Sequence, residues 1–104
     1  MKRILLACSA GMSTSLIVQK MKAVAKEQGK DYEIWAQSVN DILDDEKAFD
    51  VVLIGPQVAN RYDEVAEIAK EFGEHIPVGI IETTVYGKMK ADVILAQAEE
   101  LMNL

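Results

Sequence analysis

Residues 4–15 have the sequence ILLACSAGMSTS, in which an apolar run gives way at Cys8 to small and hydroxyl-bearing residues. The run from Ile4 to Ala7 has no polar side chain on either face, which is typical of a strand in the middle of a parallel sheet. The small residues after it predict a loop, and the amphipathic pattern of residues 16–28 predicts a helix. Ligands of open α/β sheets bind outside the carboxyl ends of the strands, so Cys8 is expected in the functional crevice.

The rest of the chain alternates between strand and helix patterns. Strands are predicted at residues 3–8, 32–37, 51–54 and 78–81, and helices at 16–28, around 41–47, through 65–72 and at 88–102. The strands at 3–8 and 51–54 are the most apolar, so they are predicted to be central. We therefore predict one α/β domain, residues 1–104, with a four-stranded parallel sheet of flavodoxin-like order 2-1-3-4 and helices on both faces. The loops after Cys8 and Ile54 then flank the switch point between the first and third strands.

Composition and charge argue against several classes of protein. The chain has 11 basic and 17 acidic residues and a net charge of −6, which argues against nucleic-acid binding. Its apolar runs are too short for a membrane span, and its start has no signal-peptide pattern. The lone cysteine allows no internal disulfide and fits a reducing cytosol. Because His75 is the only histidine, a metal site has little support, and neither a metal nor an organic cofactor is expected.

The Cys8 segment has the composition of an anion site. A thiolate is the reactive form of cysteine, and small residues allow backbone N–H groups to approach a bound phosphate closely. The hydroxyl groups of Ser9, Ser13, Thr14 and Ser15 add donors, and the start of the following helix adds a partial positive charge. These features favour a cysteine that becomes phosphorylated. Position alone leaves two alternatives open: an inert buried thiol, and hydroxyl residues that only cap the helix.

The spacing also resembles the Cys-x5-Arg phosphate loop of low-molecular-weight tyrosine phosphatases. Here Thr14 stands at the sixth position after Cys8, and no arginine or lysine occurs before Lys20. A phosphatase needs the arginine to stabilise charge in the transition state and an acid to protonate the leaving group. A phosphocysteine formed here should therefore be hydrolysed slowly, which is the behaviour of a phosphoryl carrier.

Three segments resemble IIB subunits of the lactose/cellobiose/chitobiose class in the phosphoenolpyruvate-dependent sugar phosphotransferase system. They are residues 4–15, residues 50–59 and residues Val85–Lys88. The resemblance covers nearly the whole chain in matching order and spacing. It implies that Cys8 takes a phosphoryl group from a phosphohistidine of IIA and delivers it to a sugar bound by the membrane permease IIC. The residues implied to cradle the phosphate are Ser9, Ala10, Gly11, Met12, Ser13, Thr14 and Ser15. Gln57 and Tyr86, expected on neighbouring strand-end loops, are candidates for the border of the site.

The resemblance also implies partners and a location. The expected partners are a phosphorylated IIA protein and the IIC permease, and no nucleic acid is expected. The chain is expected to be a cytoplasmic monomer that docks transiently and meets the membrane through the permease. The sugar implied is a disaccharide such as cellobiose, chitobiose or lactose. Two alternatives stay open: a phosphatase or arsenate-reductase-like hydrolase on a related fold, and a non-catalytic binding module with an inert thiol.

Overall fold

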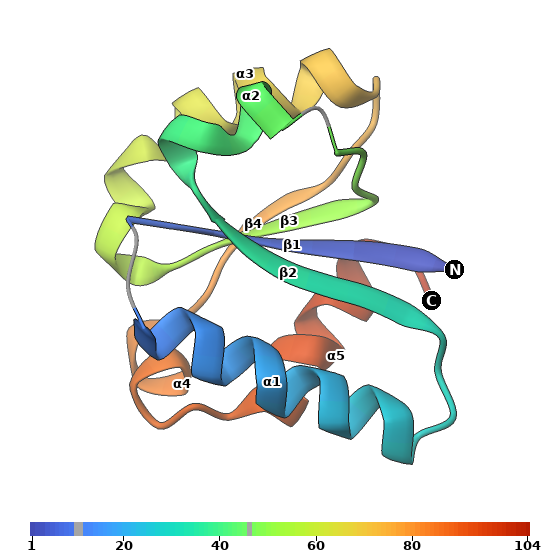
Figure 1. Cartoon of the computed structure of the whole chain (residues 1–104). Helices are drawn as coiled ribbons and strands as arrows, with labels where there is room; N and C mark the ends of the chain where they lie inside the picture. The colour runs from blue at the N-terminus through green and yellow to red at the C-terminus, as the bar shows by residue number, and fades with distance from the viewer. Residues whose placement is uncertain (10–11, 46) are drawn as a thin grey trace.

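A parallel sheet lies at the centre of the molecule (Figure 1). The computed structural model describes residues 1–9, 12–45 and 47–104. In these ranges the chain forms a four-stranded sheet of order β2-β1-β3-β4, in which every neighbouring pair is parallel. The strands are β1 (Lys2–Cys8), β2 (Tyr32–Ser38), β3 (Val51–Ile54) and β4 (Val78–Ile80). The predicted order is confirmed, with β1 and β3 in the middle.

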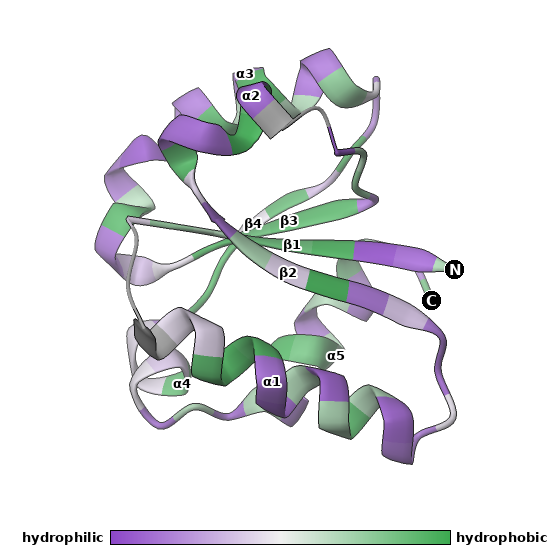
Figure 2. Ribbon diagram, in the orientation of Figure 1, coloured by the Kyte–Doolittle hydropathy of each residue, from purple (hydrophilic) through white to green (hydrophobic). Residues whose placement is uncertain are grey.

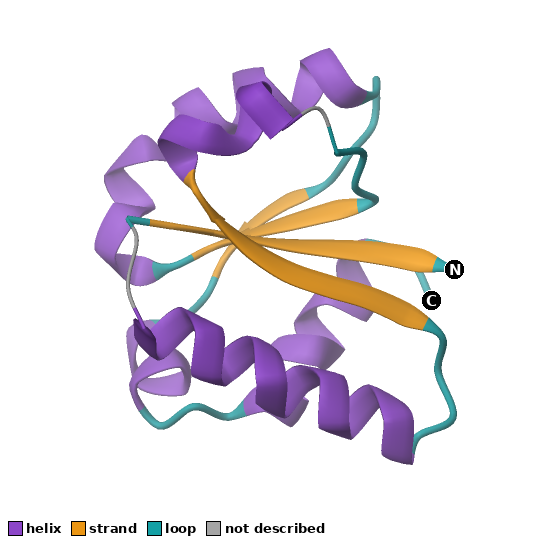
Figure 3. Ribbon diagram, viewed as in Figure 1, coloured by secondary structure: helices purple, strands orange, loops and turns teal. Residues whose placement is uncertain are grey.

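Helices cover both faces of the sheet, as predicted (Figure 3). They are α1 (Met12–Glu27), α2 (Ile42–Asp45), α3 (Tyr62–Phe72), α4 (Thr83–Gly87) and α5 (Ala91–Leu101), with 3-10 turns η1 (Val39–Asp41) and η2 (Pro56–Arg61). The helices α1, α4 and α5 lie on one face, and α2 and α3 lie on the other (Figure 1). None of the helices in the described part of the chain combines the length and the apolar composition needed to cross a membrane.

The two central strands divide their side chains between two hydrophobic cores. On one face, Ile4 and Leu6 of β1 pack with residues of α1 and α5. On the other face, Leu5 and Ala7 pack with residues of α2 and α3. Every residue of β3 and every residue from Ile4 to Cys8 is buried, and Figure 2 shows the hydrophobic character of both strands. Burial on both faces explains why these strands have continuous apolar sequences rather than alternating ones.

The helix α1 begins at Met12, four residues before the predicted start at Leu16. Hydroxyl-bearing residues usually favour caps and turns, because their side chains compete for backbone hydrogen bonds, so the sequence predicted a longer loop. The helix ends at Glu27, one residue before the predicted end at residue 28, and Gly29 follows with a φ of 69°. The N–H groups of Gly29 and Lys30 donate to the carbonyls of Lys26 and Ala25, at 3.1 and 2.9 Å, in a left-handed helix cap.

The predicted helix at residues 88–102 was wrong at its start. A separate short helix, α4, ends at Gly87, and α5 begins only at Ala91. Between them Met89 has a φ of 51°, which breaks the helical path. Nothing near Met89 in the sequence predicts this break, because non-glycine residues with positive φ are uncommon. The fourth strand also ends one residue earlier than predicted, at Ile80, although the N–H of Ile81 still donates to the carbonyl of Ile54 at 2.9 Å.

A polar cluster ties α5 to the segment between α1 and β2. The carboxylate of Glu99 accepts a hydrogen bond from Tyr32 Oη at 2.6 Å and pairs with the ammonium group of Lys30. The hydrogen bonds from Lys30 and Tyr32 hold the pKa of Glu99 below its usual range. Burial, together with the hydrogen bond to Glu99, raises the pKa of Tyr32 to about 12, so the phenol remains a donor. The cluster therefore needs an ionised Glu99.

We expect the substitution Glu99→Gln to lower the free energy of unfolding at pH 7 by about 1 kcal/mol, because a charge-assisted pair is lost. A carboxyl group whose pKa is lowered by folding stabilises the protein above its unfolded pKa and loses that effect as the pH falls. The difference between the two proteins should therefore shrink below about pH 4. Urea unfolding at several pH values measures it. Glu100→Gln, at an exposed neighbouring position, is the control; an equal loss in both variants would contradict the assignment.

Candidate active site

The carboxyl ends of β1, β2 and β3 meet at one edge of the sheet. Cys8 is the last residue of β1 and stands opposite Ser38, the last residue of β2. On the other side of β1, the N–H of Gly55 donates to the carbonyl of Ala7 at 2.9 Å, so the turn after β3 lies against the end of β1. The segments that the sequence placed on either side of the switch point are therefore adjacent.

Cys8 is buried, with 7% of its surface exposed, whereas the next residue, Ser9, is exposed. Its Sγ lies 3.5 Å from the carbonyl oxygen of Gln37 on β2, to which the thiol donates a weak hydrogen bond. The thiol therefore stands where β1 leaves the core. Gln37 was not among the predicted site residues, because nothing in the sequence marks a residue whose backbone carbonyl contacts the thiol.

The predicted phosphate loop is shorter than expected, because Met12 to Ser15 form the first turn of α1. Ala10 and Gly11 lie outside the described residues. The first N–H groups of an α-helix have no partners within the helix, and this end of the helix has partial positive charge. The first turn of α1 begins four residues after Cys8 in the chain. Its free backbone N–H groups are therefore candidates for the predicted anion site.

The predicted hydroxyl groups have different surroundings. The Oγ1 of Thr14 shares a hydrogen bond of 2.5 Å with the Oη of Tyr86, and both side chains are buried, at 3% and 6% exposure. Ser9 is exposed, and Ser15 lines a groove between α1 and β2 together with Val18. The side chains of Met12 and Ser13 lie outside what the structure describes. Thr14 therefore fixes the first turn of α1 to α4, and its hydroxyl is already engaged.

Gln57 and Tyr86 both lie beside Gly55. A Cβ atom at Gly55 would lie 3.1 Å from Gln57 Oε1 and 3.6 Å from Tyr86 Cε2, so the two side chains approach the same point after β3. Gln57 is exposed on η2. Tyr86 was expected on a strand-end loop, but it is buried in the short helix α4. The error follows from missing α4, a helix too short to show a clear periodicity.

One cation near this edge escaped the sequence analysis. Arg61, at the end of η2, donates from Nη2 to Oδ1 of Asn40 at 2.8 Å and pairs with Glu64. It thereby joins the turns that follow β2 and β3. Its Nε and Nη2 both donate to the carboxylate of Glu64, and Nη2 also donates to Asn40. Only the folded chain brings residues 40 and 61 together. Among the described residues, no cluster of histidine, cysteine, aspartate or glutamate has the arrangement of a metal site.

Comparisons with known proteins agree with this arrangement. Residues 3–97 match the family described as PTS system, Lactose/Cellobiose specific IIB subunit. The chain belongs to this family. It is 51% identical over 108 residues to the galactose-specific EIIB component of Lactococcus lactis subsp. cremoris (strain MG1363), an alignment that covers 98% of this chain and 97% of the relative. It is 50% identical over 108 residues, with the same coverage, to the cellobiose-specific EIIB component of Lactococcus lactis subsp. lactis (strain IL1403).

The fold of this IIB subunit is also that of solved relatives. The cellobiose-specific phosphotransferase IIB component of Borrelia burgdorferi superimposes with a TM-score of 0.78 at 36% sequence identity, covering 98% of this chain and 92% of that chain. The protein is thus a phosphotransferase component of a sugar transport system, as the sequence predicted. IIB components work together with IIA and IIC components of the same system.

We expect Tyr86→Phe to lower both stability and the rate of phosphoryl transfer, because the variant leaves the buried Thr14 hydroxyl without a partner. The free energy of unfolding should fall by about 1–2 kcal/mol. In the double variant Thr14→Val/Tyr86→Phe both polar groups are gone, so most of the stability should return. If the hydrogen bond positions α1, the rate should stay low in the double variant.

Tyr62→Phe is the matched control, since it removes an exposed tyrosine hydroxyl that lies 3.5 Å from the carbonyl of Val78. Urea unfolding measures the stability of each variant. The initial rate of phosphoryl transfer from IIA to the variant measures its activity. A double variant that recovers stability and rate together would limit Tyr86 to a structural role.

Proposed function

We propose that Cys8 is the residue that carries the phosphoryl group. The thiolate attacks the phosphohistidine of IIA, an S–P bond forms, the N–P bond breaks, and the histidine nitrogen keeps the electron pair. In the second step a hydroxyl group of the sugar on IIC attacks the phosphorus and releases its proton to the solvent. The S–P bond breaks, and the thiolate is regenerated. The observation that carries the proposal is the place of Cys8, at the end of the central β1 and shortly before the first turn of α1.

The rest of the segment then cradles the phosphate mainly through its backbone. Residues 9–15 contain no arginine or lysine, so the N–H groups and the helix dipole supply the positive character. Ser9 is exposed beside Cys8 and can donate its hydroxyl to the bound group. Thr14 serves instead to hold the turn, through its bond to Tyr86.

The sugar and the site of action are also part of the proposal. The galactose-specific and cellobiose-specific relatives are almost equally similar, at 51% and 50% identity, so similarity does not select between their sugars. The family description, lactose/cellobiose specific, supports the proposal of a disaccharide substrate such as cellobiose, chitobiose or lactose. It acts at the cytoplasmic face of the membrane, as a monomer that docks in turn on IIA and on IIC.

The first test is the intact mass of the chain after incubation with phosphoenolpyruvate, enzyme I, the histidine phosphocarrier protein and IIA. We expect one added phosphoryl group that requires IIA and is lost in Cys8→Ser. Inverted membrane vesicles that contain IIC are then added, and the phosphoryl group should pass to the sugar bound by IIC. Testing cellobiose, chitobiose, lactose and galactose one by one identifies the sugar that accepts it. Phosphorylation of Cys8→Ser at the same rate would place the acceptor elsewhere.

For Gln57 we expect an effect on transfer without an effect on folding, because its side chain is exposed beside Gly55. Gln57→Ala should slow one or both transfer steps about tenfold to a hundredfold, the cost of one hydrogen bond to a charged group. Its melting temperature should match that of the wild type. Asn60→Ala, at an exposed position on the same turn, is the control. Unchanged rates in both steps would remove Gln57 from the site.

A further inference from the structure

An apolar groove runs along the free edge of β4, between this strand and the helices α4 and α5. We call it the β4 groove, and its volume is about 380 Å³. Its apolar lining comes from Ile80, Val85, Val93 and Ala96. Ile80 and Val93 are 41% and 42% exposed, which is unusual for large aliphatic side chains so close together.

Side chains engage two backbone carbonyls on the free edge of β4. The carbonyl of Ile80 accepts a hydrogen bond from Gln97 Nε2 at 3.0 Å, and the carbonyl of Val78 lies 3.5 Å from Tyr62 Oη. Side chains therefore occupy the backbone acceptors that a further strand would need. The β4 groove consequently suits a partner that inserts apolar side chains, such as a helix or a loop.

One end of the β4 groove lies near the carboxyl end of β4, which is the same end of the parallel sheet as Cys8. Glu82, on its rim, follows the carboxyl end of β4 by two residues. Val85, in its wall, is the neighbour of Tyr86 in α4, and Tyr86 contacts both Thr14 and the region of Gly55. A partner that approaches Cys8 can therefore contact the β4 groove at the same time.

The charges around the β4 groove select the kind of partner. Its charged lining residues are Glu82 and Glu100, and no lysine or arginine occurs among the described residues that line it. The chain as a whole has a net charge of −6, so an anionic lipid surface repels it. Cytoplasmic loops of membrane proteins, in contrast, are rich in lysine and arginine. An apolar groove with an acidic rim is complementary to such a loop.

We propose that the β4 groove docks a cytoplasmic segment of the IIC permease in which apolar side chains are flanked by lysine or arginine. This inference rests on the proposed function, in which the chain must meet IIC after it leaves IIA. The apolar anchor gives affinity, and the acidic rim selects IIC and orients Cys8 toward the bound sugar.

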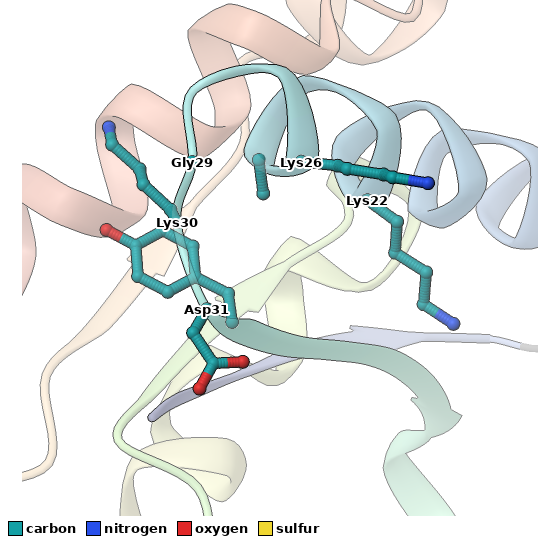
Figure 4. A pocket seen from close by; sticks show the side chains of 7 residues that line it. Lys22, Lys26, Gly29, Lys30 and Asp31 are labelled. Atoms are coloured by element: carbon teal, nitrogen blue, oxygen red, sulfur yellow. The ribbon is translucent and has the colours of Figure 1, made fainter.

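A second groove does not fit this partner. A groove at the amino end of β2 is lined by Lys22, Lys26 and Lys30, so it repels a basic segment. Figure 4 shows that these three side chains extend in different directions, and Lys30 is paired with Glu99. This lysine-lined groove lies beside Tyr32, at the start of β2. It is therefore at the opposite end of the strands from Cys8.

Binding to IIC tests the proposal independently of the chemistry at Cys8. The charge-reversal variant Glu82→Lys/Glu100→Lys and the apolar variant Val93→Ser are compared in a Cys8→Ser background. The ligands are inverted membrane vesicles that contain IIC permeases for cellobiose, chitobiose, lactose or galactose, tested one by one, and co-sedimentation measures binding. We expect both variants to bind about tenfold more weakly than the parent, as for loss of a central contact or of rim charges. Vesicles without IIC should bind none of them.

The matched control is Glu71→Lys/Glu74→Lys, which changes the net charge equally at exposed positions at the end of α3. It should bind as the parent does, and thermal melting checks that all variants fold. In the Cys8 background, the charge reversal should raise the KM for the phosphorylated chain in transfer to sugar about tenfold, with kcat unchanged. Phosphorylation by IIA should stay within about twofold of the wild-type rate.

Several outcomes would overturn the proposal. Equal weakening by the control variant would reduce the effect to net charge, and unchanged binding would remove the β4 groove from the interface. A defect confined to phosphorylation by IIA would assign the groove to IIA. If the groove variants, without IIC, have a lower sedimentation coefficient than the parent chain, the groove would be assigned to contact with a second copy of this chain. Failure of the wild-type chain to become phosphorylated contradicts the function of Cys8 instead, and leaves the binding result decisive for the groove.

Discussion

The burial of β1 on both faces is the constraint on which the site depends. Its residues from Ile4 to Ala7 are essentially inaccessible to solvent, and each large side chain among them contributes about 1.5–3 kcal/mol by leaving water. Arg3, at one end, remains partly exposed and has its N–H bonded to Asp50. Ser9, at the other end, is exposed. A shift of the strand by one residue would bury one of these polar residues, so the depth of Cys8 is fixed by packing.

The same logic explains why α1 needs a polar contact at its start. Thr14 is the buried polar residue among the described positions, and its hydroxyl would be costly to bury alone. Tyr86 supplies the partner, and its ring packs beside Gly55 after β3. The first turn of α1, the start of η2 and the short helix α4 are thus held in one arrangement. The buried hydroxyl pair thus positions the proposed backbone donors at the start of α1. A purely apolar contact would position them less specifically.

The sequence predicted the sheet well because apolar runs report burial directly. The strands β1 and β3 are continuous apolar runs, and β2, which alternates, is an edge strand. The position of Cys8 followed from the same pattern. The errors fall where conformation depends on distant contacts. Met12 to Ser15 are helical although their composition is typical of a loop, and Thr14 there is satisfied by Tyr86, 72 positions away. The break at Met89 depends on a positive φ that no local residue announces.

The contrast with a phosphatase shows how the proposed carrier keeps its phosphoryl group. An arginine in the loop would place a full positive charge and a bidentate donor against the phosphate, where it would also stabilise the transition state of hydrolysis. The start of α1 offers instead roughly half of a positive charge and fixed backbone donors. That is enough to hold a dianion but supplies less stabilisation to an attacking water. Transfer then depends on groups that each partner brings, so the order of the two steps is set by docking. A carrier of this kind needs surfaces that distinguish its partners, and the acidic rim of the β4 groove is the surface proposed for one of them.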